Sequence, residues 1–402
     1  MNVIAFRRTR LNQNSIAPVA GALLSSGVPD GFQIAIVDQT EHLPRHTRLV
    51  AFSFCTSALE EIRSEVRTIR KAHRDTLTLV AGGPHPSADP EGVLSAGFDA
   101  VFVGEGERTF PRFIEAWASG KVSLPLVQKA DRTPFDLDSS LHVVPSLGLF
   151  PFAEISRGCN FGCAFCQVSV QFGRGMRHRS PEVIGEGIAQ AIEMGFRRFR
   201  FLTPDAFAYA GGGYQRGEEA LSALLAAARK AGATQLMLGS FPSEVRPDHV
   251  TPRLLALLRR ECFNRTLVMG AQSGSDRVLS KMRRGHTVEQ VREAVALAFE
   301  AGFIPHIDVL FCFPGEQPEE RGKTLELMRW CIERGKARFH AHVYLPLPGT
   351  PLWPTPPEPL EKDLFEQIKR LEALGRVDGD WGGHHSEGRK FLRWRDEGKI
   401  RI

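Results

Sequence analysis

The stretch ISRGCNFGCAFC, residues 155–166, determines how the rest of this chain is interpreted, because it places three cysteines at C-x3-C-x2-C spacing. Thiolates are soft ligands that suit iron–sulfur clusters and zinc. A structural zinc site normally has a fourth protein ligand at similar spacing, for which His178 is the candidate. Three thiolates on a 4Fe–4S cluster instead leave one iron open for a substrate or cofactor. Gly158 and Gly162 let the backbone wrap closely around such a cluster.

A repeated strand–helix pattern surrounds these cysteines over residues 151–345. Helix starts are marked by Ser180-Pro181 and by the capping box Thr287-Val288-Glu289-Gln290. The pattern gives about six β/α units, fewer than the eight of a closed barrel. Chemistry in such barrels lies at the carboxyl ends of the strands. The polar residues at those ends are therefore site candidates: Asp205, Ser243, Glu244, Gln272 and Ser273.

Residues 1–128 also alternate strands and helices, which predicts a doubly wound parallel sheet. The predicted strands are 2–6, 32–37, 49–54, 76–81 and 99–103. Ligands bind outside the carboxyl ends of strands in such sheets, and Gly-rich loops there let the backbone approach a bulky ligand. The candidate contacts in these loops are Ser53, Thr56, Gly82, Gly83, His85, Gly104, Glu105 and Gly106.

Two further segments complete the predicted organisation. Residues 129–150, rich in Asp, Ser and Pro, are predicted to form a polar linker. Residues 346–402 are predicted to form a C-terminal extension with an amphipathic helix over 360–374. Its segment 381–385 is expected to be either a lid over the substrate or a loop packed on the barrel. Adjacent histidines rarely share one metal ion, so His384 and His385 are not expected to form a metal site.

The composition is that of an ordinary globular protein, with 402 residues, 42% of them hydrophobic and 24% charged. A net charge of +5 gives no reason to propose a nucleic-acid partner, and no apolar run approaches the length of a membrane helix. Seven cysteines, three of them clustered, do not resemble a secreted disulfide framework. We therefore expect a cytoplasmic protein without a nucleic-acid or membrane partner.

These motifs together resemble the radical S-adenosylmethionine (SAM) superfamily, in particular its members with an N-terminal cobalamin-binding domain. Residues 155–166 resemble the signature of the superfamily. The segments VAGGPH at 80–85 and VGEGE at 103–107 resemble the cobalamin domain, and RGHT at 284–287 resembles members with an N-terminal partner domain. The implied fold is α/β, with a Rossmann-like domain followed by a partial (β/α)6 barrel and a short C-terminal extension.

The resemblance also implies roles for individual residues. Cys159, Cys163 and Cys166 would hold a 4Fe–4S cluster whose open iron chelates the amino and carboxylate groups of SAM. One electron would then split SAM into methionine and a 5′-deoxyadenosyl radical. The other residues implied in SAM binding are Phe165 at the adenine, Asp205 at the amino group, Ser243 and Glu244, Gln272 and Ser273 at the ribose and carboxylate, and Arg283 or Arg284 at the carboxylate.

The implied activity is that of a cobalamin-dependent methyltransferase acting on an unactivated carbon of a small-molecule or peptide substrate. A protein such as flavodoxin or ferredoxin would supply electrons. The chain departs from the family because it lacks the Asp-x-His-x-x-Gly motif whose His ligates cobalt, since His42 and His46 do not fit it. Both cobalamin without a His ligand and an empty domain therefore stay open. Cys312, where the family has Gly, is expected to be a buried, inert thiol.

Three other functions are considered. The first is a radical SAM enzyme without cobalamin that catalyses a rearrangement, an oxidation or C–C bond formation. The second is a methylthiotransferase, which would need an N-terminal cluster, whereas Cys55 is the only cysteine in residues 1–128. The third, from a different class, is a non-enzymatic iron–sulfur sensor.

Overall fold

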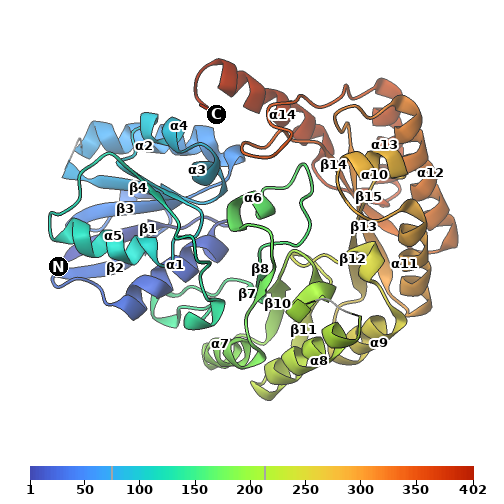
Figure 1. Ribbon diagram of the computed structural model, residues 1–402, viewed down its shortest axis with the longest axis horizontal. Coiled ribbons are helices and arrows are strands. Elements are labelled where there is room, and N and C mark those ends of the chain that lie inside the picture. Colours follow the sequence, from blue (N-terminus) through green and yellow to red (C-terminus); the bar gives the residue numbers. More distant parts are fainter. Residues whose placement is uncertain (74–75, 212–213) are drawn as a thin grey trace. The chain divides into compact units, whose positions relative to one another are not determined.

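A computed structural model describes residues 1–73, 76–211 and 214–402 and divides the chain into two units (Figure 1). The first unit consists of Met1–Phe152 and Arg393–Ile402, and the second of Ala153–Leu392. The predicted boundaries differ from these at the linker and at the C-terminus. Both differences follow from contacts within the first unit.

The segment 129–150 is part of the first unit and not a free polar linker. It buries Val144 and Leu149 in the same apolar cluster as Ile16 and Ile114, and Phe135 is also buried. The composition suggested a solvated linker because the polar residues between these apolar side chains dominate its sequence.

The last residues of the chain also belong to the first unit. The backbone N–H of Arg401 donates to Asp89 at 3.0 Å, and the Lys399 ammonium lies 3.4 Å from a Glu60 carboxylate oxygen. The predicted C-terminal extension is therefore divided between the two units at Arg393.

The first unit is built on a six-stranded parallel sheet with the order β2-β1-β3-β4-β5-β6. Its strands are β1 (Asn2–Arg7), β2 (Phe32–Val37), β3 (Thr47–Ser53), β4 (Thr78–Gly82), β5 (Ala100–Val103) and β6 (Leu126–Lys129). Four consecutive residues of β1 are buried, as expected for a central strand covered on both faces. The first five strands confirm the predicted doubly wound domain, whereas the sequence analysis missed β6, a short polar edge strand.

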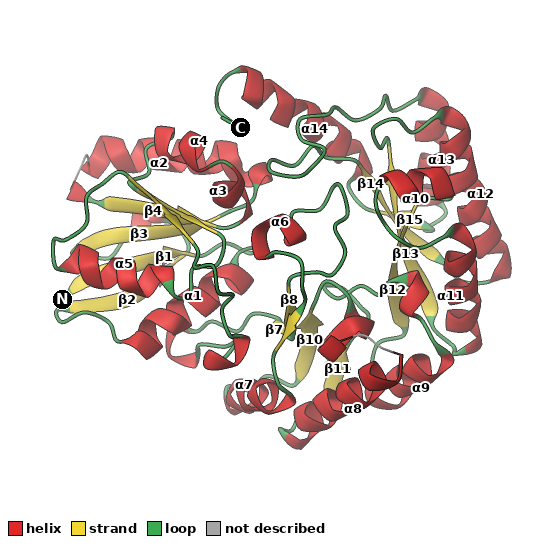
Figure 2. Cartoon of the chain, in the orientation of Figure 1, coloured by secondary structure: helices red, strands yellow, loops and turns green. Residues whose placement is uncertain are grey.

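Helices line both faces of this sheet, as Figure 2 shows around the strands β1–β4. They are α1 (Gln13–Ser26), α2 (Leu59–His73), α3 (Pro84–Ala88), α4 (Pro90–Ser95) and α5 (Thr109–Ala118). The chain adds strands on one side of β1 first and then on the other, so the succession of strands changes direction between β1 and β3. Doubly wound folds bind ligands in the crevice at such a switch point. Asn12 joins these two strand ends, because its side-chain amide donates to the carbonyls of Arg7 at 2.9 Å and Ser53 at 3.0 Å.

The second unit is a partial barrel of parallel strands, as predicted. One sheet contains β7 (Ala153–Glu154), β10 (Arg198–Leu202) and β11 (Gln235–Met237); the other contains β12 (Thr266–Gln272), β13 (Ile304–Phe311), β14 (Arg338–Val343) and β15 (Val377–Asp378). Parallel bridges at Thr203–Ser243 and Val245–Met269 continue the strand succession between the sheets. The C-terminal extension thus adds a strand, β15, that the sequence did not predict.

The principal helices of this unit are α7 (Pro181–Glu193), α8 (Tyr214–Lys230), α9 (Pro252–Glu261), α11 (Val288–Glu300), α12 (Pro318–Arg334), α13 (Lys362–Ala373) and α14 (Trp381–Asp396). The helix predicted over 360–374 is confirmed as α13. The segment 381–385 is the start of α14, which corrects the expectation of a loop, whereas its role as a lid stays a prediction. Short elements around the cysteines are α6 (Val168–Phe172), α10 (Asp276–Lys281) and an antiparallel pair, β8 (Ser156–Arg157) and β9 (Arg177–His178).

The capping box at the start of α11 is confirmed. Thr287 accepts from the backbone N–H of Gln290, and the Gln290 side chain accepts from the backbone N–H of Thr287 at 2.9 Å. We expect Thr287→Ala to lower the free energy of unfolding by about 1 kcal/mol, because it leaves helix-start N–H groups without their acceptor. The measurement is the urea midpoint of the barrel transition. Thr68→Ala, on the exposed surface of α2, is the control and should leave that midpoint unchanged.

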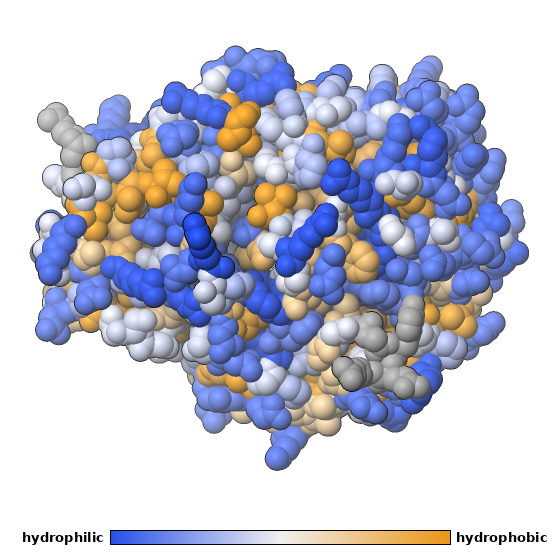
Figure 3. Space-filling model, viewed as in Figure 1, coloured by the Kyte–Doolittle hydropathy of each residue, from blue (hydrophilic) through white to orange (hydrophobic). Residues whose placement is uncertain are grey.

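Hydrophilic residues dominate the face drawn in Figure 3, and apolar residues there form separate patches. Among the described residues, no helix combines the length and the apolar character that crossing a membrane requires.

Candidate functional site

The cysteine loop leaves the barrel through β8 and returns through β9, and its backbone requires glycine. Gly158 has φ +81°, and a Cβ there would lie 2.5 Å from the carbonyl oxygen of Gly175. The loop is fastened to the barrel by the N–H of Ala164, which donates to the carbonyl of Met282 at 3.0 Å. The three cysteines therefore lie on a tightly turned loop whose backbone has little room to change conformation.

Cys159, Cys163 and Cys166 line a single cavity of about 530 Å3. That volume lies within the roughly 300–1,000 Å3 typical of small-molecule sites. Burial raises the pKa of the Cys166 thiol to about 11, so a bound cation is what would hold it as a thiolate. His178, the alternative zinc ligand, does not line this cavity, and its Nδ1 lies 2.9 Å from Ser156 Oγ. The donor set is three thiolates, which fits a 4Fe–4S cluster with one open iron.

Cationic side chains from two neighbouring segments point into the same cavity. Arg284 donates to the carbonyl of Gly270 at 2.6 Å and to the Cys163 sulfur at 3.5 Å, while its Nε is buried without a hydrogen-bond partner. Arg246 lies over the Phe161 ring at 3.5 Å from its centroid, and its Nε and Nη1 are likewise buried and unpartnered. Unpaired buried donors are costly, so an anionic ligand group in the cavity would satisfy both guanidinium groups.

Carboxylates occupy the strand ends on the cavity wall. Asp205 is buried and forms an ion pair with His249 at 2.7 Å. Burial lowers the pKa of His249, but contact with Asp205 outweighs it and the net pKa is raised. Glu244 faces the cavity although protein surrounds it, and this enclosure, together with the charge of Asp308, raises the pKa of Glu244 above its usual range. The raised pKa values favour the protonated forms of both Glu244 and His249 at these strand ends.

Most of the residues predicted to bind SAM meet in this cavity: Phe165, Asp205, Glu244, Gln272 and Arg284. Three do not, which corrects those predictions. Ser243 Oγ lies inside a turn, where it accepts from the N–H of Gly239 and donates to the carbonyl of Ser240. Ser273 is fully buried and accepts from the N–H of Ser275. Arg283 has φ +57° and is exposed outside the cavity, so that of the two arginines Arg284 faces inward.

Three residues of the cavity wall were not predicted from the sequence: Arg246, Asp308 and His342. His384, from the segment proposed as a lid, also lines the cavity. Asp308 and His342 lie inside β13 and β14, respectively. The available signal was the recurrence of polar residues at every second position in both strands. For Arg246 the signal was its position two residues after Glu244, which puts both on one side of an extended segment.

The candidate ligand edge of the first unit is formed by the ends of β3, β4 and β5. Ser53, Gly82, Gly83 and Gly104 are small and only half buried, so backbone is accessible along this edge. Such an edge fits a broad, flat ligand such as a corrin, because no large side chain covers the strand ends.

Two predicted contacts at this edge are enclosed, in disagreement with the prediction that their side chains touch a ligand. His85 is fully buried, with Nδ1 3.1 Å from Thr56 Oγ1 and its ring against Phe54. Thr56 is buried with it. Burial lowers the pKa of His85 to about 4, so the ring is neutral. Its enclosed side chain connects the loops after β3 and β4.

The last two predicted residues of this edge lie on the loop after β5. Glu105 is half buried and accepts from the N–H of Phe135 at 3.1 Å, which ties this loop to the segment 129–150. A Cβ on Gly106 would approach a Val19 methyl group at 3.2 Å, so glycine keeps the loop close to α1. Contact of Glu105 and Gly106 with a ligand stays a prediction.

Comparison with known protein families and proteins agrees with this geometry. The radical SAM superfamily model matches residues 153–328, and the B12 binding domain model matches residues 35–114. A tRNA-2-methylthio-N(6)-dimethylallyladenosine synthase of Chlorobium phaeovibrioides is 28% identical over 79% of this chain and 70% of its own length. An uncharacterized methyltransferase of Pyrococcus horikoshii is 27% identical over 76% of this chain and 68% of its own length.

Solved structures share the fold. The radical SAM methyltransferase TsrM of Kitasatospora setae, solved with cobalamin and a 4Fe–4S cluster, superposes with a TM-score of 0.63 at 16% identity, over 88% of this chain and 74% of its own. The cobalamin-dependent radical enzyme OxsB gives a TM-score of 0.58 at 13% identity, over 82% and 52% of the two chains.

A radical SAM domain implies a 4Fe–4S cluster, SAM and a source of electrons, and a B12-binding domain implies cobalamin. The three thiolates of the barrel and the open strand edge of the first unit fit these groups. This chain carries a B12-binding domain ahead of a radical SAM domain.

Proposed function

We propose that this chain is a cytoplasmic, cobalamin-dependent radical SAM methyltransferase that acts on an unactivated carbon of a small-molecule or peptide substrate. The observation that carries the proposal is one cavity that joins three cysteines, two guanidinium groups with unpartnered nitrogens and several carboxyl groups, in a chain with a B12-binding domain. A flavodoxin or ferredoxin is the proposed electron donor. No nucleic-acid partner is proposed.

When bound, the cluster and SAM supply one-electron cleavage of SAM, and cobalamin supplies methyl transfer. The residues of the chain bind and orient. Arg284 and Arg246 hold the SAM carboxylate with charge-assisted hydrogen bonds, and Asp205 and Glu244 accept from its amino group. Phe165 and Gln272 contact the adenosine portion. The cavity walls exclude water from the reacting atoms and orient the substrate, which favours removal of hydrogen from the substrate carbon that is to be methylated.

Replacing Arg284 tests this assignment. We expect Arg284→Gln to weaken SAM binding by at least about tenfold, because a hydrogen bond to a charged group contributes roughly 1.5–3 kcal/mol. The measurement is the dissociation constant of SAM for the reconstituted protein, with iron content determined on the same sample. Arg283→Gln, at the exposed neighbouring position, is the control and should bind SAM as the wild type does. Equal affinity of both variants would contradict the assignment.

The curated relatives include methylthiotransferases by name, and one feature of the chain disfavours that activity here. An additional N-terminal cluster would need several cysteine ligands. Cys55 is the only cysteine in residues 1–152, and its sulfur lies 3.0 Å from Ser57 Oγ. A methyl group, without added sulfur, is therefore the group we propose to be transferred.

The proposal is tested by anaerobic reconstitution with iron, sulfide and hydroxocobalamin, followed by desalting. We expect about one cobalamin per chain in the visible spectrum and 5′-deoxyadenosine after addition of SAM and a reductant. Deoxyadenosine without retained cobalamin would instead favour the radical SAM enzyme without cobalamin, for which the enclosed His85 is the supporting observation. A well-formed cluster that cleaves no SAM would favour the iron–sulfur sensor.

A further inference from the structure

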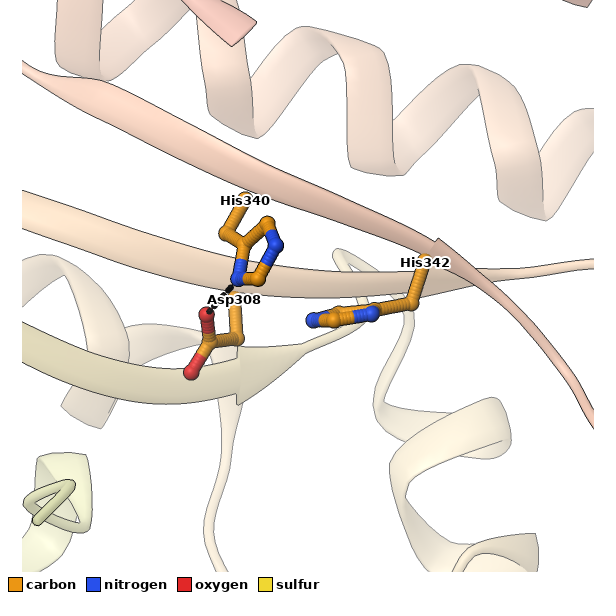
Figure 4. Close-up of side chains that lie close together, drawn as sticks. All are labelled: Asp308, His340 and His342. Carbon is orange, nitrogen blue, oxygen red and sulfur yellow. Dashed lines mark ion pairs between the residues drawn. The ribbon is translucent and has the colours of Figure 1, made fainter. Parts of the chain in front are cut away.

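Beside the cysteines, the wall of the barrel cavity carries a second group of metal-ligating side chains. Asp308 on β13 and His340 and His342 on β14 each offer one ligand atom, and these atoms all lie within 4.8 Å of one another. Figure 4 shows the Asp308 carboxylate against His340 and the His342 ring extending toward this pair. We propose that this Asp308–His340–His342 triad binds one divalent transition-metal ion, separate from the iron–sulfur cluster.

The register of the sheet creates the triad. Asp308 is paired with His340 across β13 and β14. His342 follows two residues after His340, so both imidazoles leave the same face of the strand. The Asp308 Oδ1 atom lies 3.5 Å from His340 Nδ1, and the two imidazole rings lie 4.3 Å apart. Three ligands from two hydrogen-bonded strands form a rigid base for a metal ion.

The three ligand atoms must move slightly closer together to bind one metal ion. Ligand atoms about 2.0–2.1 Å from a metal ion stand roughly 3 Å apart. The ion pair between Asp308 and His340 is already close to this value. Rotation of the His342 ring about its own side-chain bonds would supply the remaining movement, because His342 is not fully buried and no hydrogen-bond partner of its ring lies among the described residues.

The ligand set selects the class of ion. Two imidazoles and one carboxylate suit zinc, iron(II) and other first-row divalent ions better than magnesium or calcium, which prefer oxygen ligands alone. An arrangement of two histidines and one carboxylate leaves coordination positions free. Asp308 and His342 both line the cavity, so these positions face the proposed substrate space.

The surroundings of the triad support binding of a cation. Asp378 adds negative charge near His340, and His384 stacks on His342 with a centroid distance of 5.5 Å and an interplanar angle of 8°. His306 lies 6.0 Å from His340 and is held by Asp378 at 3.2 Å. An ion bound here would offer a free position to a lone-pair donor of the substrate. This role rests on the proposed function, whereas metal binding itself does not.

The experiment uses the full chain with its cluster and cobalamin reconstituted, so that the cysteines are occupied. The protein is dialysed against micromolar Zn²⁺, and zinc and iron per chain are determined together. We expect about one zinc in the wild type and at least a tenfold loss of zinc affinity in Asp308→Asn, His340→Gln and His342→Gln, with iron and cobalamin unchanged. His385→Gln is the matched control on α14 and should retain zinc.

X-ray absorption at the zinc edge identifies the ligands independently of the variants. We expect nitrogen and oxygen neighbours at about 2.0–2.1 Å with the outer-shell pattern of imidazole. Sulfur neighbours at about 2.3 Å would place zinc on the cysteines and overturn the proposal. It would also be overturned if the wild type bound no stoichiometric zinc, or if all three variants retained it. None of these measurements requires SAM cleavage. They can therefore succeed or fail whether or not the protein has the proposed activity.

Discussion

Cys163→Ala is expected to abolish SAM cleavage. Cys163 is 7% exposed, lies on the cavity and receives a hydrogen bond from Arg284. Two remaining thiolates cannot hold a 4Fe–4S cluster that keeps one iron open for SAM. Loss of the cluster should return the reaction to its uncatalysed rate, a decrease of at least about 10⁶-fold. The measurements are iron and sulfide content after anaerobic reconstitution, and 5′-deoxyadenosine with SAM and a reductant.

Cys262→Ala is the matched control for this experiment. Cys262 lies at the end of α9, does not line the cavity, and burial raises the pKa of its thiol to about 12. It is therefore a neutral thiol without a predicted ligand role, and its replacement should leave cluster content and deoxyadenosine formation intact. Retention of cluster and activity in Cys163→Ala would contradict the assignment of the cluster to this loop.

Gly83→Ala is expected to remove cobalamin binding by the first unit. Gly83 has φ +98°, and a Cβ there would lie 2.7 Å from Ser53 Oγ and 3.0 Å from the Phe54 nitrogen. The substitution therefore combines backbone strain with a clash between the loops after β3 and β4, at a cost of roughly 2–3 kcal/mol. We expect retained cobalamin to fall from about one per chain to near zero, measured from the visible spectrum after desalting.

Gly27→Ala is the control that distinguishes the effect of the steric clash at Gly83 from the effect of backbone strain. Gly27 has φ +93°, close to that of Gly83, but a Cβ there would meet nothing within 4 Å. It ends α1 away from the carboxyl edge of the sheet. Both variants should lose stability because of the left-handed backbone, but only Gly83→Ala should lose cobalamin. Equal retention of cobalamin by the two proteins would mean that the β4 loop is not part of the binding site.

The features that the sequence predicted well depend on short-range patterns. The cysteine motif, each strand or helix of the alternating pattern and the Thr287 capping box are recognised from a few neighbouring residues, and the structure confirms the shared cavity of the cysteines, the alternation and the capping box. The strand-end rule placed Asp205, Glu244 and Gln272 in the cavity correctly. In each case the physical cause is local: backbone hydrogen bonding or the common direction of parallel strands.

What the sequence did not reveal depends on register and on single backbone angles. Ser243 and Glu244 are neighbours, yet only Glu244 faces the cavity, because successive side chains of an extended segment point in opposite directions. Arg283 turns outward at φ +57° while Arg284 turns inward. Asp308 and His342 were missed because polar residues at alternate positions of a strand give no sign of their partners until the strands are paired.

The central claim is that one chain joins SAM and cobalamin in methyl transfer, and an isotope measurement tests it most directly without knowledge of the substrate. The reconstituted protein is incubated anaerobically with a reductant and SAM carrying a 13C-labelled methyl group, and the corrin is extracted and analysed by mass spectrometry. The account predicts labelled methyl in the protein-bound corrin fraction, with much less from Gly83→Ala. Retained cobalamin that acquires no label from SAM would contradict it.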